Sequence, residues 1–463
     1  MPRPKKIHIS GAGLVGSLLA VMLGNRGYEV SVLERRQDPR RVKNEGGRSI
    51  NLALSSRGIA ALKTAGLMDE VEKLLIPMKG RMLHLEDGKE VFSSYGQRPD
   101  EVIFSVSRDD LNVLMMDNAE QSPPVNVHFG QKLESIDFER NIFSARDVLA
   151  GDSKEQSFEL FIGADGAGSK TRRVLMPANG GKATSEFLDH DYKELEIPAS
   201  SDGSYQIEPN ALHIWPRGDF MLIALPNQDG SFTVTLFLPK EGAVSFQSLE
   251  NPKNVRPFFE EYFPDAIRLI PNLEADFADN PAGRLGTVRC APWYYSGHSG
   301  KVVILGDASH AIVPFHGQGM NAGFEDCSEL NRLLDKHKDD WNLVLPEFDR
   351  IRRPNAEAIA DMAIENYTTM RSSVIDPKFH LKKELGFELE KRFPDRFMPR
   401  YSMVMFQLLP YAEAFDRGRK QKAILNQLVE NRDSVDDVDF ALAKQLIEQQ
   451  LLPMTVLAAE EES

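Results

Sequence analysis

The 463-residue sequence predicts an α/β fold that is interrupted by an inserted β-sheet and followed by a helical C-terminal region. Three observations support this prediction. A strand–helix–strand pattern with a glycine-rich first turn opens the chain. Short strand-like segments separated by Gly, Pro, Asn and Asp occupy its middle. Apolar residues at helical spacing dominate from Leu345 onward.

The N-terminal unit is predicted from three consecutive segments: a strand from Lys5 to Ser10, a helix from Leu14 to Arg26 and a strand from Tyr28 to Leu33. Together they form a βαβ unit of the Rossmann type. Ser107 and Asp110 have the spacing of a capping box, which predicts a helix from Ser107 to about Glu120. The segment from Val125 to Ile162 is expected to hold several short strands.

The middle of the chain is predicted to form an antiparallel sheet from three segments: Ala211 to Trp215, Phe220 to Leu225 and Phe232 to Leu238. The chain then returns to a buried strand from Val302 to Leu305, followed by a helix from about Gly319 to Leu334. In the helical region beyond Leu345, breaks are expected at five prolines: Pro354, Pro377, Pro394, Pro399 and Pro410.

These patterns divide the chain into four consecutive parts. Residues 1–182 and 286–375 are expected to form two parts of one nucleotide-binding domain, the second with a long helix. Residues 183–285 are expected to form the inserted mixed or antiparallel sheet, which serves as a substrate domain. Residues 376–463 are expected to form the C-terminal helical region.

Composition argues against several classes of protein. The chain has 55 Lys and Arg against 69 Asp and Glu, and a formal net charge of −14 disfavours nucleic-acid binding. Two cysteines, Cys290 and Cys327, cannot form a disulfide framework, and neither they nor the ten histidines show the spacing of a metal site. No apolar stretch reaches the roughly 18 residues that cross a bilayer, so we expect a cytoplasmic protein without stable membrane insertion.

The first chemical motif is the glycine-rich turn Gly11-Ala12-Gly13-Leu14-Val15-Gly16. Gly11 permits a tight turn, Gly13 lets the backbone approach a pyrophosphate, and Gly16 lets helix and strand pack closely. Glu34 ends the second strand about 20 residues later, where a carboxylate can accept hydrogen bonds from ribose hydroxyls. An acid at this position disfavours a 2′-phosphate, so the motif predicts bound FAD or NAD rather than NADP.

Two further motifs follow predicted strands. Gly163 to Ser169 contains Asp165 and, taken alone, is also compatible with an ordinary strand-to-helix turn. Leu305 to His310 contains Asp307, whose carboxylate could hold the ribityl hydroxyls of a flavin. Gly317 and Gly319 then allow backbone amides to approach a planar ring, and the helix that follows would direct its positive end toward a reduced flavin.

In this order, the three motifs resemble those of the single-component flavoprotein monooxygenases. The resemblance implies tightly bound FAD, with NADPH as a transient co-substrate that has no lasting pocket, and dioxygen as the oxidant. It also implies that the flavin carries the chemistry, so no side chain is expected to be catalytic in its own right. By position, the resemblance assigns sixteen residues to FAD binding: Gly11, Gly13, Leu14, Val15, Gly16, Glu34, Arg35, Ala53, Arg108, Leu133, Asp165, Asp307, Gly317, Gly319, Met320 and Asn321.

Within that family the chain is most similar to the kynurenine-hydroxylating branch, the kynurenine 3-monooxygenases, from about residue 7 to residue 420. Five segments carry the similarity: Gly47 to Leu54, Tyr192 to Leu195, Leu212 to Pro216, Pro314 to Asn321 and Pro399 to Met403. Animal and fungal members have a hydrophobic C-terminal anchor. This sequence lacks such an anchor and instead has the acidic residues Glu460 to Glu462 at its end. Attachment to an outer mitochondrial membrane is therefore not expected.

The same resemblance suggests a substrate site around Arg81, which matches the arginine that binds the substrate carboxylate. A guanidinium suits a carboxylate because it can form two parallel hydrogen bonds, although a lone arginine is usually a solvated surface residue. Tyr95, Asn366 and Tyr401 match the polar residues that accompany it. Four residues match the apolar walls around the substrate ring, or simply pack in the core: Leu225, Phe237, Phe315 and Met370. His316 is expected to line the pocket without transferring a proton.

The resemblance implies an FAD-dependent monooxygenase that uses NADPH and dioxygen to hydroxylate L-kynurenine at the aromatic 3-position, giving 3-hydroxykynurenine. Such a step serves tryptophan breakdown or pyridine-nucleotide synthesis, and the sequence leaves both open. One alternative is a hydroxylase of another aromatic substrate on the same fold. Another is a non-catalytic binding protein of this architecture, such as the Rab GDP-dissociation inhibitors, which the intact Gly306-Asp307 and Gly317-Gln318-Gly319 segments disfavour.

Overall fold

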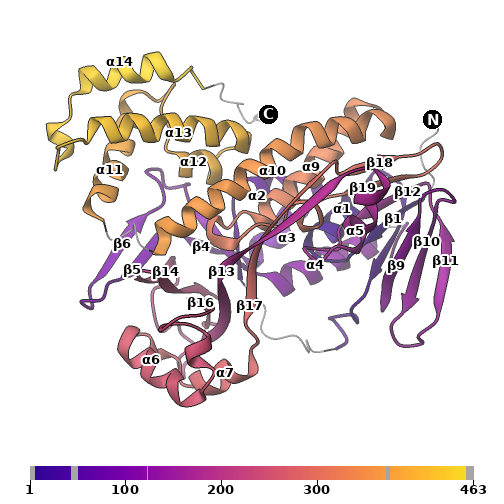
Figure 1. The fold of residues 1–463 in the computed structure, drawn as a ribbon, viewed down its shortest axis with the longest axis horizontal. Helices are drawn as coiled ribbons and strands as arrows, with labels where there is room; N and C mark the ends of the chain where they lie inside the picture. The colour runs from indigo at the N-terminus through magenta and orange to yellow at the C-terminus, as the bar shows by residue number, and fades with distance from the viewer. Residues whose placement is uncertain (1–5, 43–50, 123, 372–375, 455–463) are drawn as a thin grey trace.

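The structure is a computed structural model that describes residues 6–42, 51–122, 124–371 and 376–454. Lys5, the part of the Gly47 to Leu54 segment before Asn51, and Glu460 to Glu462 lie outside the described residues. The molecule combines a nucleotide-binding α/β unit, a large sheet across its centre and a group of helices formed by the C-terminal part of the chain (Figure 1).

The α/β unit is built on a six-stranded sheet, in the order β18-β19-β12-β1-β2-β8. All neighbouring strands in it are parallel except β18 and β19. The predicted βαβ unit is confirmed, because β1 pairs with β2 in parallel and the helix α1 (Leu14–Asn25) lies between them in sequence. The six strands are β1 (Lys6–Ser10), β2 (Glu29–Glu34), β8 (Val125–Phe129), β12 (Leu160–Gly163), β18 (Tyr294–Ser296) and β19 (Lys301–Ile304).

Two small three-stranded sheets flank this unit. The sheet β11-β10-β9 confirms the prediction of several short strands before Ile162, and β3-β7-β4 leads into the capped helix α4 (Arg108–Gln121). The capping prediction is also confirmed, since Ser107 Oγ accepts a hydrogen bond of 3.3 Å from Asp110 N. The six strands are β3 (Asn51–Leu54), β4 (Ile76–Met78), β7 (Ile103–Ser107), β9 (Gln131–Asp137), β10 (Ile142–Asp147) and β11 (Ser153–Ser157).

The central sheet has seven strands in the order β17-β13-β16-β15-β14-β5-β6. The three strands predicted for it are confirmed as an antiparallel group: β14 (Ala211–Arg217), β15 (Phe220–Pro226) and β16 (Phe232–Pro239). Two of the other four strands precede the predicted insertion, and two cross its boundaries: β5 (Gly80–His84) and β6 (Glu90–Ser94) precede it, whereas β13 (Lys182–Ile197) crosses the first boundary and β17 (Gly283–Ala291) the second. The division at residues 182 and 285 remains a prediction, because the sheet itself crosses both boundaries.

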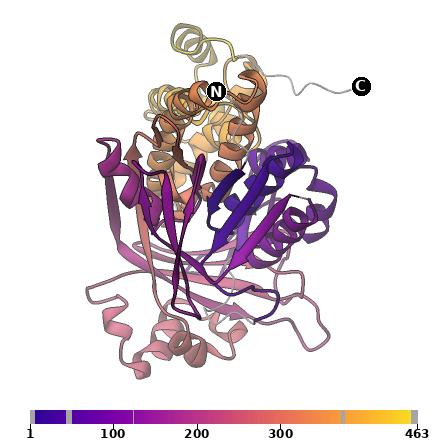
Figure 2. The same ribbon diagram turned by 90° about the vertical axis from the view of Figure 1, so that its right-hand side faces the viewer.

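Helices cover the central sheet at opposite ends of the molecule (Figures 1 and 2). On one side, α6 (Val255–Tyr262) and α7 (Leu273–Asp279) bury aromatic residues against the sheet, with Phe259 and Phe263 fully buried beside Trp215. On the other side, the C-terminal helices pack beside α10 (Trp341–Arg371). They are α11 (Pro377–Arg392), α12 (Arg400–Met405), α13 (Tyr411–Leu428) and α14 (Phe440–Gln450).

The prediction of a helix break at Pro354 is wrong, because α10 runs through it without interruption. Pro354 lies on the exposed side of α10, where the carbonyl that loses its intrahelical partner can be hydrated. The other four prolines do mark helix boundaries. Pro377 begins α11, Pro394 follows it, and Pro399 and Pro410 are the residues before α12 and α13.

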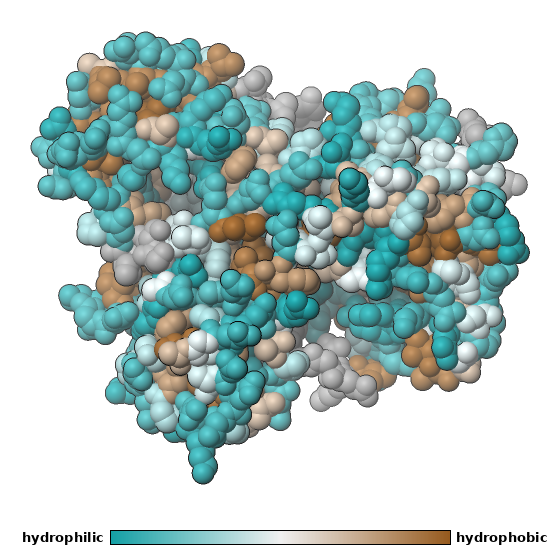
Figure 3. Space-filling model, in the orientation of Figure 1, coloured by the Kyte–Doolittle hydropathy of each residue, from teal (hydrophilic) through white to brown (hydrophobic). Residues whose placement is uncertain are grey.

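Hydrophilic residues cover most of the face shown in Figure 3, with apolar residues in small separate groups. Within the described residues, no helix is both long enough and apolar enough to cross a membrane. The remaining helices of the α/β unit are α2 (Ser56–Ala65), α3 (Met68–Val71), α5 (Lys170–Ala178), α8 (Asp307–His310) and α9 (Gly319–Lys336).

Candidate active site

The glycine-rich turn after β1 has the geometry of a phosphate cradle. Gly11 has φ +103°, and a Cβ there would lie 2.4 Å from the Ala164 carbonyl oxygen. A Cβ on Gly16 would lie 1.9 Å from the Gly11 carbonyl oxygen, so both positions require glycine. Gly13, in contrast, faces open space at the start of α1, which has neither a side-chain cap nor an acidic residue in its first turn. The amides of that turn are therefore available to an anionic ligand.

Glu34 lies at the end of β2, directly beside this turn. Its carboxylate accepts hydrogen bonds of 2.9 Å from Ala12 N and 2.9 Å from Arg36 N. The structure therefore brings Glu34 together with Gly11 to Gly16 as predicted from the sequence. Arg35, the next residue, is exposed, whereas the Leu133 side chain is buried in the hydrophobic core. Contacts of Arg35 and Leu133 with a nucleotide remain predictions.

The second motif, Gly163 to Ser169, packs against the glycine-rich turn of the first motif. Ala164 N donates to Ser10 O, which places the Ala164-Asp165 backbone against Gly11. The Asp165 carboxylate caps α5, accepting hydrogen bonds of 2.8 Å from Lys170 N and 2.9 Å from Thr171 N. Asp165 thus stabilises the start of a helix, and a direct contact with FAD remains a prediction.

Asp307 is the first residue of α8, directly after the turn that follows β19. Gly306 has φ +59°, and a Cβ there would lie 3.1 Å from the side chain of Val15, the second residue of α1. The Asp307 side chain is exposed and forms no ion pair within the described part of the chain. Arg172 connects this turn to the second motif by donating to the carbonyls of Ala308 (2.8 Å) and Ala167 (2.6 Å). An unpaired carboxylate beside α1 fits the hydroxyls of a ribityl chain.

Asn321 holds together the loop that precedes α9. Its Nδ2 donates to the carbonyls of Ala53 and Gly317, both at 2.8 Å, and its Oδ1 accepts from Ser55 N at 2.9 Å. A Cβ on Gly317 would lie 3.0 Å from Ala53 Cβ, so the loop also packs closely against β3. The Asn321 side chain therefore positions the backbone of the loop. Met320, at the start of the 18-residue helix α9, is buried, and Gly319 begins that helix.

These observations fit FAD. The uncapped start of α1 suits the pyrophosphate, Glu34 lies at the ribose end, Asp307 suits the ribityl chain, and the start of α9 suits the ring. Arg108, at the head of α4, has an exposed side chain. Burial raises the pKa of Glu194, a residue of β13, to about 6, although the positive charge of Arg108 acts in the opposite direction. Glu194 lies in the Tyr192 to Leu195 segment of the resemblance, but the sequence predicts no role for it in the site.

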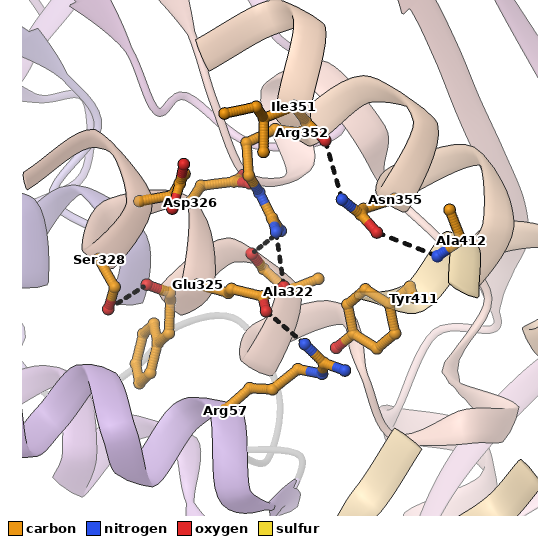
Figure 4. Close-up of polar contacts among 12 residues, drawn as sticks. Arg57, Ala322, Glu325, Asp326, Ser328, Ile351, Arg352, Asn355, Tyr411 and Ala412 are labelled. Carbon is orange, nitrogen blue, oxygen red and sulfur yellow. Dashed lines mark hydrogen bonds and ion pairs between the residues drawn. The ribbon is translucent and has the colours of Figure 1, made fainter. Parts of the chain in front are cut away.

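A buried ion network joins α2, α9 and α10 (Figure 4), and its Asp326 bonds to the turn that precedes Asp307. Arg352 of α10 forms ion pairs of 2.7 Å with Asp326 and 2.6 Å with Glu325, and Glu325 also pairs with Arg57 of α2. Asp326 in turn accepts hydrogen bonds of 2.9 Å from Gly306 N and 2.6 Å from His310 Nε2. Burial by itself would raise the pKa of Asp326, but His310 and Arg352 outweigh it and lower this pKa to about 2.

The same network reaches the C-terminal helices. The Arg57 guanidinium lies 3.8 Å from the centre of the Tyr411 ring, and Tyr411 Oη donates to Gln318 Oε1 at 2.6 Å. Asn355 Oδ1 accepts from Ala412 N at 3.0 Å (Figure 4). The start of α13 is thereby connected to the Gly317-Gln318-Gly319 loop. No sequence pattern predicts this network, because its members come from distant parts of the chain and match no motif.

Four of the eight predicted substrate residues line one cavity of about 630 Å³: Arg81, Tyr95, Asn366 and Tyr401. The Tyr95 and Tyr401 rings stack with centres 5.4 Å apart. The Arg81 guanidinium lies 5.6 Å from the first ring centre and 5.3 Å from the second. His316 also lines the cavity, as predicted, and stacks on Tyr401 at 5.7 Å. Because His316 immediately precedes Gly317, the cavity reaches the loop assigned to the flavin ring.

Several polar atoms on this lining are buried without a hydrogen-bond partner in the described chain: Arg81 Nε, Tyr95 Oη, His316 Nδ1 and Ser402 Oγ. Such atoms cost free energy unless a ligand or water satisfies them. Burial, together with the charges of Arg400 and Arg81, lowers the pKa of His316 to about 3. Burial raises the pKa of Tyr95 and Tyr401, so both hydroxyls stay protonated at neutral pH and can donate. The cavity is therefore prepared for a polar, anionic ligand.

The four predicted apolar residues are not on the cavity lining. Leu225, Phe237, Phe315 and Met370 are all buried in hydrophobic clusters. Phe315 stacks on Tyr367 at 4.2 Å and lies 4.9 Å from Phe237. It is connected to the cavity through its carbonyl, which accepts a hydrogen bond of 2.5 Å from Asn366 Nδ2. Contact of these four side chains with a substrate ring remains a prediction.

The chain is similar to a family model and to curated proteins over most of its length. Residues 5–234 and 287–363 match the family model described as FAD binding domain. The kynurenine 3-monooxygenase of Myxococcus xanthus is 45% identical over 97% of this chain and 96% of its own length. That of Stenotrophomonas maltophilia is 46% identical over 96% of this chain and 97% of its own length.

Solved structures share the fold at lower identity. The p-nitrophenol 4-monooxygenase PnpA of Pseudomonas putida has a TM-score of 0.64 at 18% identity and covers 83% of this chain and 93% of its own. PqsL of P. aeruginosa, in complex with 2-aminobenzoylacetate, has a TM-score of 0.62 at 19% identity and covers 79% of this chain and 96% of its own. The predicted fold class is thereby confirmed. Because the FAD binding domain matches and the identity to these relatives extends over nearly the whole of both chains, the chain belongs to the kynurenine 3-monooxygenase family of FAD-binding proteins.

Proposed function

We propose that this protein uses FAD, NADPH and dioxygen to hydroxylate L-kynurenine at the aromatic 3-position, giving 3-hydroxykynurenine. One observation carries the proposal. A partly buried guanidinium, Arg81, faces a cavity that adjoins the flavin loop, and it has no carboxylate partner among the described residues. An amino acid with an aromatic ring supplies both the missing carboxylate and a ring to place near the flavin.

Arg81 is the group that binds the substrate carboxylate in this proposal. Its planar fork can form two parallel hydrogen bonds to a carboxylate, and the stacked rings of Tyr95 and Tyr401 hold the guanidinium in place. The two tyrosine hydroxyls can donate further hydrogen bonds to the same anion. Asn366 acts differently. One N–H of its Nδ2 donates to Phe315 O, and its Oδ1 is an acceptor that suits the α-ammonium of the substrate.

Bound FAD would take up hydride from NADPH and activate dioxygen, which is the source of the transferred oxygen atom. The protein has to orient the ring and exclude water. The substrate's aromatic amine already donates electron density to the carbon that is attacked, so no side chain needs to remove a proton from the substrate. His316 is consistent with this view, because its pKa of about 3 keeps it neutral at physiological pH. We assign His316 to the wall of the cavity.

The test is NADPH oxidation with and without L-kynurenine, with the product identified by mass. We expect kynurenine to stimulate oxidation and to yield one hydroxylated product per NADPH consumed. A hydroxybenzoate should stimulate weakly or not at all. Stimulation by the hydroxybenzoate but not by kynurenine would instead support a hydroxylase of another aromatic substrate.

Replacing Asp307 by Ala should weaken FAD retention while leaving the protein folded. The ribityl hydroxyls lose a charged acceptor, and a hydrogen bond to a charged group is worth roughly 1.5–3 kcal/mol, or about one to two decades in affinity. The measurement is the FAD content after extensive dilution, with circular dichroism to verify folding. Asp335→Ala, on the exposed end of α9, is the matched control and should retain FAD. Unchanged retention in Asp307→Ala would contradict this role.

A cytoplasmic location is a further proposal, based on the absence of a membrane-crossing stretch in the sequence. Cell fractionation of the native protein without detergent tests it. We expect recovery in the supernatant after membranes are pelleted. Recovery of folded protein mainly in the membrane fraction would contradict the proposal.

A further inference from the structure

The cavity beside Arg81 is cationic although the chain as a whole is acidic. Its lining contains two carboxylates, and both are engaged: Glu365 forms an ion pair of 2.7 Å with Arg400, and Asp376 caps α11 by accepting from Lys378 N at 2.9 Å. The same lining contains five cationic side chains: Arg81, Lys382, Lys383, Arg400 and Lys422. An excess of positive charge in a partly closed cavity raises the local concentration of anions.

Lys383 stands out among these cations because of where its ammonium group lies. Lys383 Nζ donates to Ser93 Oγ at 2.6 Å and to Ser94 O at 2.8 Å. Ser93 is the residue directly opposite Arg81 in the antiparallel pair of β5 and β6. Side chains at directly opposite positions share one face of the sheet, with Cβ atoms about 4.5–5.5 Å apart. The helix α11 therefore brings a second cation to the face that carries Arg81.

Neither cation has a carboxylate partner in the part of the chain that the structure describes. The two hydrogen-bond partners of Lys383 are neutral, and the centre of the Phe387 ring lies 5.6 Å from its Nζ. An ammonium has three donors, so one of them has no hydrogen-bond acceptor among the described residues. Burial and the charge of Arg81 lower the pKa of Lys383 to about 8. Two like charges held together in partly desolvated surroundings are unfavourable unless an anion lies between them.

We propose that Lys383 is a second cationic contact for the substrate carboxylate, alongside Arg81, and that it helps select ring substrates that carry a carboxylate. This inference rests on the proposed function, because it takes L-kynurenine as the ligand. It also gives α11 a part in the site. The hydrogen bonds to Ser93 and Ser94 place the ammonium, and its free donor binds the anion.

The proposal predicts a pH dependence of binding. Lys383 is charged below a pH of about 8 and neutral above it, so kynurenine should bind more weakly as the pH rises from 7 to 9. Three other titratable groups on the lining, His316, Tyr95 and Tyr401, do not explain such a change. His316 is already neutral, and burial keeps the pKa of Tyr95 and Tyr401 raised. A Lys383 variant keeps His380 and the remaining lining groups, so any difference between its pH dependence of binding and that of the parent comes from Lys383.

The experiment measures dissociation constants on the FAD-loaded enzyme at pH 7, by calorimetry, for L-kynurenine and for its decarboxylated analogue kynuramine. Lys383→Met should raise the dissociation constant of kynurenine about tenfold and leave that of kynuramine unchanged. Lys391→Met, at an exposed position of the same helix, is the control and should change neither. Lys383→Arg should keep most of the affinity at pH 7. Because arginine stays charged, its affinity for kynurenine should fall less between pH 7 and 9 than that of the parent.

Each other outcome overturns the proposal. Equal weakening of both ligands in Lys383→Met would mean that Lys383 only holds α11 against β6. An unchanged kynurenine constant with a raised KM for NADPH would assign the cation to the coenzyme. Arg81→Ala separates this proposal from the proposed function. If Arg81→Ala weakens kynurenine binding and Lys383→Met does not, the Lys383 inference alone is wrong. If Arg81→Ala has no effect, the carboxylate site of the proposed function is wrong as well.

Discussion

Arg81→Ala is expected to weaken the binding of L-kynurenine by about 30-fold or more. The substitution removes a charge-assisted pair and leaves the substrate carboxylate poorly solvated beside the stacked Tyr95 and Tyr401 rings. Losing one partner of such a buried pair costs roughly 2–5 kcal/mol. Titration of the FAD-loaded enzyme with kynurenine measures the change. FAD content should stay the same, because Arg81 lies on β5, outside every flavin motif.

Two comparisons make this result specific. Arg81→Lys should recover only part of the loss, since an ammonium cannot form the two parallel hydrogen bonds of a guanidinium. Arg140→Ala replaces an exposed arginine on the nucleotide-binding side and should leave kynurenine binding unchanged. If the dissociation constant of Arg81→Ala equals that of the parent, the carboxylate anchor lies elsewhere in the protein.

The parts of the fold that the sequence predicted correctly depend on short-range geometry. Gly11 and Gly16 have to be glycines because a Cβ would collide with backbone atoms of the same turn or of its immediate neighbour. The cap at Ser107 and the strands β14 to β16 follow from adjacent residues and turn signals. Such signals stay readable in a sequence because the interacting residues are close together in it.

Features that depend on distant pairing could not be predicted in this way. Arg81 pairs in register with Leu212 of β14, so the neighbouring strands β5 and β6 join a sheet whose other five strands lie far along the chain. Pro354 is tolerated in α10 only because that side of the helix is exposed, which no local pattern reveals. The role of Arg81 is predicted by resemblance. The place of Lys383 beside it follows from the contact between α11 and β6, which no sequence pattern shows.

The buried network around Asp326 leads to the second large expected effect. Asp326→Asn should lower the free energy of unfolding by about 3–5 kcal/mol, because it removes one of the two carboxylates that neutralise Arg352. Asparagine would also turn an N–H donor toward a site where Arg352, His310 and the Gly306 amide all donate. Urea unfolding of the FAD-loaded protein measures the change. Glu329→Gln, which removes a pair with Arg332 on the surface of the same helix, should cost within about 1 kcal/mol.

The pH dependence of unfolding provides an independent readout of the same residue. The pKa of Asp326 is about 2 in the folded protein, below the ordinary value of 3.8 for an aspartate, so its contribution to stability is complete above about pH 4. It is lost as the pH falls from there toward 2. The parent protein should therefore lose stability over that range, and Asp326→Asn should lose less. FAD retention should weaken in the same variant, because Gly306 N loses the acceptor that fixes the Asp307 turn. A variant with the parent's unfolding midpoint and FAD content would show that this turn is held by other contacts.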